Sequence, residues 1–307
     1  MLGRMDNRAE VREFLTSRRA KVSPEHVGLP AGTNRRVAGL RRSEVATLAG
    51  VSVEYYTKLE RGAIRGASPE VLHAVSEALR LDDSERAYLF DLAQAASPVA
   101  RPPRRRNPKS WSPHPSLQWV LDAVTAGPAF VRNGRMDLLA TNSLGRAFYK
   151  DCYDMPGQPP NIARFTFLDQ RSYDFYPDWD SFAGITVAIL RTEAGRDPHN
   201  KELHDLIGEL STRNEEFRRL WGAHDVRHHG SGFKTFRHSV VGEMTLAYEG
   251  MDLEAEPGLT LTVYCAEPGS DSAERMRLLA SWAASEELEA RAELGATLDD
   301  ESAQHRS

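Results

Sequence analysis

Residues 40–62 read LRRSEVATLAGVSVEYYTKLERG, and this stretch decides the fold of the first part of the chain. Its pattern predicts a helix, a tight turn at Gly50 and a second helix. The apolar positions that can close a small core between the two helices are Val45, Leu48, Ala49, Val51, Tyr56 and Leu59. The second helix keeps an open face, and the DNA major groove admits one such helix and presents a distinct pattern for each base pair. The stretch therefore predicts a DNA-binding protein.

The open face of the second helix carries side chains that suit base recognition. The four candidates for base contact are Val53, Glu54, Thr57 and Lys58. Glu54 can accept from a cytosine amino group, Lys58 can donate to guanine, and Val53 can pack on a thymine methyl group. The candidates for phosphate contact flank the helix pair: Arg41, Arg42, Ser43, Ser52, Arg61 and Arg65. The alternative for any one arginine is a solvated surface charge.

The length and composition fit a two-domain protein of the cytoplasm. The chain has 307 residues, which is enough for two separate hydrophobic cores. No apolar run approaches the roughly 18 to 20 residues that span a bilayer, and the first residues lack an apolar signal segment. Cys152 and Cys265 are too few and too far apart for a disulfide framework or a zinc module. We therefore expect a cytoplasmic protein that associates with the nucleoid when it binds DNA, and no membrane partner.

The charge is distributed unevenly along the chain. The formal net charge is −5, but residues 1–110 hold 20 Lys and Arg against 13 Asp and Glu, whereas the remainder holds 19 against 31. A basic first part can bind phosphates, and an acidic second part is repelled by them. Uneven charge is common in proteins generally, so this observation adds only modestly to the DNA-binding prediction.

A basic, proline-rich segment separates two predicted domains. Residues 97–113 read SPVARPPRRRNPKSWSP, in which proline opposes a helix and five basic residues lie between Arg101 and Lys109. This segment is a solvated, semi-rigid linker, with phosphate contact as an additional possibility. We predict an all-α helix-turn-helix domain of about five helices over 1–96, the linker over 97–113, a second domain over 114–285 and a polar, fraying tail over 286–307.

In the second domain, strand patterns lie at both ends of a helical middle. Asn133-Gly134 is a strong hairpin signal between two short apolar runs. The predicted strands are 129–132, 136–140, 233–241, 243–251 and 259–264. The strongest helical segments are 182–192 and 203–221, and a last helix covers about 272–284. This order predicts an α+β domain with one antiparallel sheet and helices on a face.

Both parts of the chain resemble one group of bacterial regulators. Residues 40–62 resemble the helix-turn-helix of Cro and phage-repressor-type regulators, the xenobiotic-response-element-like (XRE) class. The positions that fall on its pattern are Leu40, Val45, Ala46, Gly50, Val51, Leu59, Glu60, Arg61 and Gly62. Residues 35–62 look like the version found in regulators with an MmyB-like ligand-binding domain. The second part resembles that domain in PSLQWVLDAVTAGPAFVRNGRMDLLATN (115–142), NIARFTFLD (161–169), PDWD (177–180), LRTEAGRDPHN (190–200), LIGELSTRNEEFRRLWGAHDVRHHGSGFKTFRHSVVGEMTLAYE (206–249) and LTLTVYCAEPGSDS (259–272).

The resemblance implies a PAS-like fold with a five-stranded antiparallel sheet in the second domain. It also implies a pocket for a small, largely apolar molecule, with a fatty acid as the family-level expectation. Two places depart from the family's pattern. Gln170 stands where the family usually has Pro, and residues 154–160 form a short, proline-rich segment where a pocket-lining loop differs.

Aromatic residues at inward positions of the second domain have two interpretations. Core packing explains any one of them, and a cavity lined by some of them is the alternative. The pocket candidates are Phe130, Tyr149, Arg164, Phe165, Trp179, Arg191, Trp221, Tyr248 and Tyr264. A ligand carboxylate favours an arginine, so Arg164 and Arg191, with Asn133, are the candidate polar anchors.

We expect neither a metal, a cofactor nor a catalytic site. The candidate metal cluster is His224, Asp225, His228, His229 and His238. Residues 225–227 begin a strand-like run, and neighbouring side chains of a strand face opposite sides, so His228 and His229 cannot both be ligands. The sequence lacks G-x-S-x-G, H-E-x-x-H and Walker motifs. Cys152 and Cys265 are predicted to be buried structural residues.

These observations favour a bacterial transcription regulator that is not an enzyme. We expect a homodimeric repressor that binds a double-stranded operator and whose DNA affinity depends on a small hydrophobic ligand, such as a fatty acid. Two alternatives stay open: an enzyme that uses the helix-turn-helix as a tether, and a module whose second part binds another protein. A closed apolar cavity favours the regulator, turnover or a bound metal favours the enzyme, and an exposed apolar groove favours the interaction module.

Overall fold

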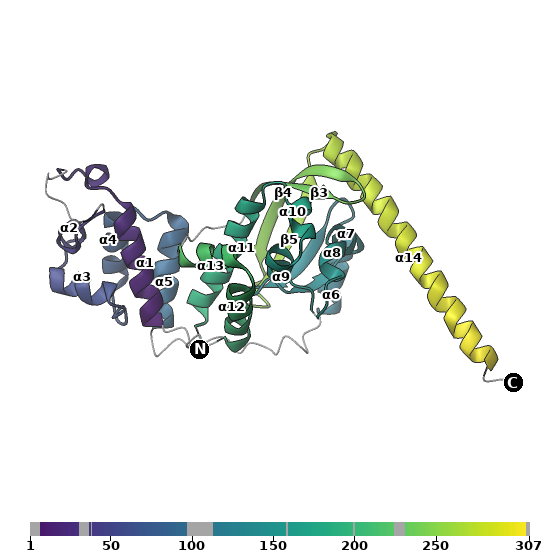
Figure 1. Ribbon diagram of the computed structural model, residues 1–307, viewed down its shortest axis with the longest axis horizontal. Coiled ribbons are helices and arrows are strands. Elements are labelled where there is room, and N and C mark those ends of the chain that lie inside the picture. Colours follow the sequence, from purple (N-terminus) through teal and green to yellow (C-terminus); the bar gives the residue numbers. More distant parts are fainter. Residues whose placement is uncertain are drawn as a thin grey trace. The chain divides into compact units, whose positions relative to one another are not determined.

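The computed structural model describes residues 7–30, 37, 39–96, 113–157, 159–198, 200–223 and 231–304, which form two compact units. The first unit contains the described residues up to 96 together with residues 180–223. The second unit contains residues 113–179 and 231–304. Residues 97–112 of the predicted linker lie outside the described residues, as do His224, Asp225, His228 and His229 of the candidate metal cluster. Figure 1 labels the α-helices of both units and the strands β3, β4 and β5.

The described residues up to 96 form five α-helices around one hydrophobic core. The helices are α1 (Asn7–Lys21), α2 (Arg42–Leu48), α3 (Val53–Glu60), α4 (Pro69–Ala78) and α5 (Asp83–Ala95), and a short 3-10 helix, η1 (Pro24–Val27), follows α1. The core contains Phe14, Val45, Tyr56, Leu72 and Leu89. This arrangement confirms the predicted helix-turn-helix domain. The prediction for Leu48 is wrong, because Ala46 and Ala49 occupy the inward positions of that turn and the Leu48 side chain is exposed.

A glycine turn and a serine cap fix the junction between α2 and α3. Gly50 has a φ of +65°, and the N–H of Val51 donates to the Ala46 carbonyl at 3.0 Å. This Schellman arrangement ends α2 and confirms the turn expected at Gly50. Ser52 then begins α3, because its hydroxyl accepts from the Tyr55 N–H at 3.0 Å. The side-chain bond satisfies one of the N–H groups that a helix start leaves unpaired.

Three further helices of the first unit come from the middle of the chain. They are α11 (Trp179–Arg196), α12 (Lys201–Arg213) and α13 (Glu215–Gly222). The continuous helical segment predicted over 203–221 is two helices. Asn214 takes an extended conformation between them, and its side chain caps α13 by accepting from the Phe217 N–H at 2.7 Å. Residues 180–223 fall within the predicted second domain, 114–285, yet they group in space with the helices of the first unit.

The second unit is built on a five-stranded antiparallel sheet among its described residues. Its strands are β1 (Ala129–Asn133), β2 (Leu138–Thr141), β3 (Ser231–His238), β4 (Gly242–Asp252) and β5 (Leu259–Ala266), in the order β2-β1-β5-β4-β3. The sheet confirms the predicted α+β, PAS-like domain. The hairpin expected at Asn133-Gly134 is present, and the Asn133 side chain accepts from the Arg135 N–H at 2.9 Å.

Helices cover both faces of this sheet (Figure 1). The short helices are α6 (Pro115–Ala123), α7 (Ser143–Phe148), α8 (Lys150–Tyr153), α9 (Ile162–Leu168) and α10 (Arg171–Phe175). On one face, Phe148 of α7 and Phe175 of α10 contact Phe236 of β3 at centroid distances of 4.9 and 5.5 Å. On the other face, Leu121 of α6 packs in a cluster with Val131. Alternation along the strands therefore buries side chains on both faces.

The chain ends in one long helix, α14 (Asp271–Gln304). Met276, Leu279 and Ala283 are buried among the side chains of α14 that the structure describes, so its first part packs against the rest of the second unit. The helix is longer than the predicted one, which ends at about residue 284, and its backbone continues to Gln304 through a stretch rich in Ala, Glu and Leu, which favour a helix. Among the described residues, no helix combines the length and the apolar character that crossing a bilayer requires.

Candidate functional site

The outer surface of α3 presents the four residues predicted to contact bases. Val53, Glu54 and Lys58 are exposed, with Val53 at 41% exposure, and Thr57 is half-buried. Tyr56, Leu59 and Glu60 form the buried face of the same helix. Tyr55 is also exposed on this surface, and the sequence analysis missed it because its aromatic ring suggests a core position. The structure thus brings the predicted base-contact residues together on one open helix face.

A buried carboxylate, Glu60, fixes the orientation of α3. The Glu60 side chain is fully buried and accepts from the Thr16 hydroxyl at 2.9 Å and from Arg19 Nη2 at 2.8 Å. Arg42 Nε of α2 donates to its second oxygen at 3.0 Å. Burial acts to raise the pKa of Glu60, but the hydrogen bonds from Arg19 and Arg42 outweigh it, so the pKa lies below its ordinary value. The sequence does contain a signal for the burial of Glu60, because Glu60 lies one helical turn after Tyr56, which is on the buried face of α3.

The residues predicted to contact phosphate lie at the start of α2, at the two ends of α3 and in the loop that follows α3. Arg41, Ser43, Arg61 and Arg65 are exposed. Ser52 is also exposed, although its hydroxyl is engaged in capping α3. Arg42 is about half exposed, at 47% of its side chain, and its guanidinium is shared with Glu60. Five of the six residues are therefore exposed at the surface, and the sixth, Arg42, is partly exposed and also has a structural partner.

One face of the sheet, which we call the aromatic face, gathers five of the nine pocket candidates. Phe130, Tyr248 and Tyr264 lie on the strands, and Phe130 contacts Tyr264 and Tyr149 at centroid distances of 5.9 and 5.4 Å. Phe165 of α9 joins the cluster through Phe175 and Tyr176. Burial raises the pKa of Tyr264 to about 12 and that of Tyr149 well above its ordinary value. These phenols therefore stay neutral at physiological pH.

The other four pocket candidates lie elsewhere. Trp179 packs against Phe167 and Tyr173, and Arg164 is half-buried on α9. Arg191 and Trp221 belong to the first unit, where the Arg191 guanidinium lies 4.3 Å from the centre of the Trp221 ring. Arg191 also forms an ion pair with Glu10, so a protein carboxylate holds it. The candidate anchor Asn133 is likewise occupied, because its amide donates to Asp137 in the β1–β2 hairpin at 2.8 Å.

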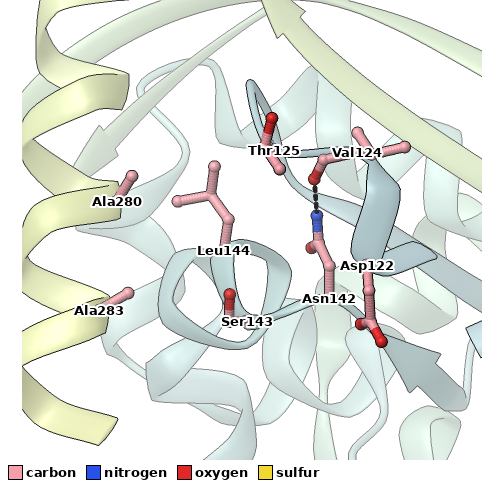
Figure 2. Close-up of a pocket in the computed structure, with 8 residues that line it drawn as sticks. All are labelled: Asp122, Val124, Thr125, Asn142, Ser143, Leu144, Ala280 and Ala283. Atoms are coloured by element: carbon pink, nitrogen blue, oxygen red, sulfur yellow. Dashed lines mark hydrogen bonds between the residues drawn. The ribbon is translucent and has the colours of Figure 1, made fainter. Parts of the chain in front are cut away.

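A hollow of about 370 Å³ lies in the second unit between α6, the start of α7 and α14 (Figure 2). Figure 2 shows Ala280 and Ala283 of α14 facing Ser143 and Leu144 of α7. The hollow is lined by Asp122, Val124, Thr125, Asn142, Ser143, Leu144, Ala280 and Ala283. The nine sequence-predicted pocket residues are not among this lining, so sequence reasoning missed this feature. Its walls come from segments far apart in the chain.

The described residues offer no group of three or more His, Cys, Asp or Glu side chains that could hold a metal ion. His238, the described member of the candidate cluster, is buried, and its Nε2 lies 3.1 Å from the Ala147 carbonyl. Burial raises the pKa of Cys152 to about 12, which leaves its thiol protonated. The prediction that Cys265 is buried is wrong, because its side chain is exposed on the face of β5 opposite Tyr264.

Comparisons with known proteins match both parts of the chain to described families. Residues 113–279 match the family model described as MmyB-like transcription regulator ligand binding domain. Residues 11–89 match a helix-turn-helix domain. The first match covers more than half of the chain and includes helices α11 to α13. A search of curated proteins found no match.

Proposed function

The chain belongs to the family of MmyB-like transcription regulators, and from this membership we propose that it is a ligand-controlled repressor. As a member it combines a helix-turn-helix domain with a ligand-binding domain. The proposal adds that the protein acts in the cytoplasm as a homodimer on a double-stranded operator. It also adds that a small hydrophobic ligand of the fatty-acid type binds the second domain and changes the affinity for DNA.

The exposed face of α3 is the observation that supports DNA reading. Val53, Glu54 and Lys58 project from a helix whose other side is buried, and the exposed Arg61 lies at its C-terminal end. Base contacts specify a site, and phosphate contacts position the protein. Two or three good base contacts, each worth about 1–3 kcal/mol of discrimination, are enough to define a half-site.

The dimer and the ligand response follow from general constraints on such regulators. One short recognition helix reads few bases, so helix-turn-helix proteins commonly act as dimers on two half-sites about one helical turn apart. A ligand changes DNA affinity only if it binds one arrangement of the protein better than another. A coupling free energy of about 1–3 kcal/mol would change operator affinity roughly 5- to 150-fold, which is sufficient for a switch.

The experiment that tests this function begins with selection of bound duplexes from a random DNA library by the full-length protein. We expect enrichment of an inverted repeat, and native mass spectrometry should find two protein chains on each enriched duplex. Mass spectrometry of the freshly purified protein should also reveal a co-purified apolar molecule. Its addition should change operator binding, and a reporter gene behind the operator should be silenced. Selection that enriches no sequence would overturn the DNA-reading part of the proposal.

A further inference from the structure

Tyr55 is an exposed aromatic residue of α3 that the core of the first unit does not use. Its side chain is 37% exposed, whereas the next tyrosine, Tyr56, is fully buried. The hydrophobic core contains Tyr56 and Leu59 but not Tyr55. Within the described part of the chain, the Tyr55 side chain has no hydrogen bond, ion pair or ring contact. Packing therefore does not account for this side chain, and its hydroxyl is available to a molecule outside the protein.

Helical periodicity places Tyr55 on one flank of the open face of α3. Successive residues of an α-helix are turned by about 100° around its axis. Tyr56 and Leu59 lie on the buried side, so Glu54 and Lys58 point almost directly away from that side. Tyr55 lies between these two directions, about a quarter turn from each. Its side chain therefore borders the face that carries the predicted base contacts.

The dimensions of the DNA major groove give the two flanks of α3 a defined position. An α-helix with its side chains measures about 10–12 Å across, and the groove is about 12 Å wide. When Glu54 and Lys58 face the base edges, the flanks of the helix lie next to the two sugar–phosphate walls of the groove. Tyr55 belongs to one flank, and Thr57 lies towards the other. Tyr55 is thus placed beside phosphates and not above the bases.

Both ends of α3 hold the backbone of Tyr55 in place. At the start of the helix, the Tyr55 N–H donates to the Ser52 hydroxyl at 3.0 Å. At its end, the buried Glu60 carboxylate accepts from Arg19 at 2.8 Å and from Arg42 at 3.0 Å. A group that is held before binding loses less conformational entropy when it makes a contact. Tyrosine hydroxyls are among the groups that donate to phosphate oxygens in protein–DNA complexes.

We propose that the Tyr55 hydroxyl donates a hydrogen bond to a DNA phosphate oxygen and so fixes the orientation of α3 in the groove. The inference rests on the proposed DNA-reading function and adds to it a residue and the chemical group that this residue contacts. A phenol is neutral, so its contact releases no counterion, whereas an arginine contact does. Tyr55 therefore adds affinity for every duplex and adds nothing to the salt dependence of binding.

The test measures the affinity of full-length Tyr55→Phe for the selected operator and for a random duplex by fluorescence anisotropy. Loss of the hydroxyl should weaken both complexes about tenfold, as expected for one hydrogen bond to a charged acceptor. The slope of log K against log salt should stay at the native value, whereas Arg61→Ala should reduce it by about one. The matched control is Tyr173→Phe, which removes the hydroxyl of an exposed tyrosine in the second unit and should change neither affinity.

Neutral methylphosphonate groups, introduced one at a time along the operator, locate the contact. At the phosphate that Tyr55 contacts, the substitution should weaken binding of the native chain. The same substitution should have little further effect on Tyr55→Phe, because both changes remove one hydrogen bond and are therefore not additive. Losses that add at every phosphate would show that Tyr55 contacts none of them, and the proposal would be overturned.

The outcomes separate this contact from the proposed function. Native affinity of Tyr55→Phe for both duplexes would overturn the contact and leave the DNA-reading function in place. A loss confined to the operator would also overturn it, since the side chain would then contact a base. If the native chain binds no duplex, both the contact and the proposed function are overturned. Thermal unfolding followed by circular dichroism should give the same midpoint for Tyr55→Phe and the native chain, and a lower midpoint would show that the hydroxyl stabilises the protein itself and overturn the proposal.

Discussion

Arg191 and Glu10 form a buried ion pair between residues 181 positions apart, with 2.5 Å between Arg191 Nη1 and Glu10 Oε1. The Tyr88 hydroxyl donates to the same carboxylate oxygen at 2.6 Å. The Arg191 side chain is fully buried, donates to the Trp221 carbonyl and lies over the Trp221 ring. The cluster joins α1 and α5 of the helix-turn-helix domain to α11 and α13. Since α11 and α13 fall within the ligand-binding family match, a ligand-dependent shift in them would act directly on α1.

Replacement of Arg191 by methionine should strongly destabilise the protein. The change leaves the Glu10 carboxylate buried without its cation, and loss of one member of a buried pair costs about 3–5 kcal/mol. The free energy of unfolding from urea titration measures this loss. Arg196→Met is the matched control on the same helix, because Arg196 forms a half-exposed pair with Asp91 and such pairs contribute about 1 kcal/mol or less. Similar small losses in both variants would contradict a structural role for the buried pair.

The stability of the first unit should depend on pH through Glu60. The pKa of Glu60 is lower in the folded chain than the ordinary value of 4.5. The unfolded chain therefore takes up the proton first as the pH falls, so the stabilisation is complete above about pH 5 and is lost progressively as the pH falls towards the folded pKa. Urea titrations between pH 3 and 6 should show that the free energy of unfolding falls less steeply with decreasing pH for Glu60→Gln than for the native chain. If the free energy of unfolding falls equally steeply in both proteins, other carboxylates are responsible for the loss of stability in acid.

Loss of a base contact and loss of a phosphate contact should have different effects on DNA affinity. Lys58→Ala should relax base preference at one position of the selected operator, with a cost of about 1–3 kcal/mol on that site and little change on random DNA. Arg61→Ala should weaken binding to every duplex and reduce the slope of log K against log salt by about one. Fluorescence anisotropy at several salt concentrations distinguishes the two. Equal losses on operator and random DNA for Lys58→Ala would remove Lys58 from the base-contact set.

Two glycines with positive φ should differ in their tolerance of alanine. Gly50, with a φ of +65°, has open space where a Cβ would lie, so Gly50→Ala should cost only the left-handed strain of about 1–2 kcal/mol. Gly62, with a φ of +94°, would place its Cβ 2.4 Å from the Arg8 carbonyl oxygen of α1. Gly62→Ala must in addition push α1 and α3 apart and should cost more than Gly50→Ala. Thermal unfolding of the two variants measures the difference in stability. An equal loss of stability in both would argue against close packing of Gly62 on α1.

Local signals were sufficient to predict most elements of the fold. The turn at Gly50 and the cap at Ser52 depend on neighbouring residues, and so does the hairpin at Asn133-Gly134, so the sequence shows them directly. The five-stranded antiparallel sheet followed from the family resemblance, whereas the order of its strands was not predicted. The predicted base-contact residues also lie on one exposed face, because helical periodicity separates a buried side from an open one.

The remaining features depend on contacts between distant residues. Glu60 is a charged residue on a buried face, and only its partners Arg19 and Arg42 make that position favourable. Arg191 was expected to anchor a ligand, but its partner Glu10 lies in the first helix of the chain. Periodicity along one segment contains no information on such pairs.

The burial of Glu10 also restricts which domains of related proteins can replace the ligand-binding domain of this protein. A chimaera that joins residues 1–96 to a ligand-binding domain from another protein keeps Glu10 and Tyr88 but lacks Arg191. The foreign domain must then provide another cation for the buried Glu10 carboxylate. Recombination between members of the family should therefore succeed most readily when the donor of the sensor also supplies an arginine at the matching place on its helix. The buried ion pair therefore restricts which sensor sequences this helix-turn-helix domain can be joined to.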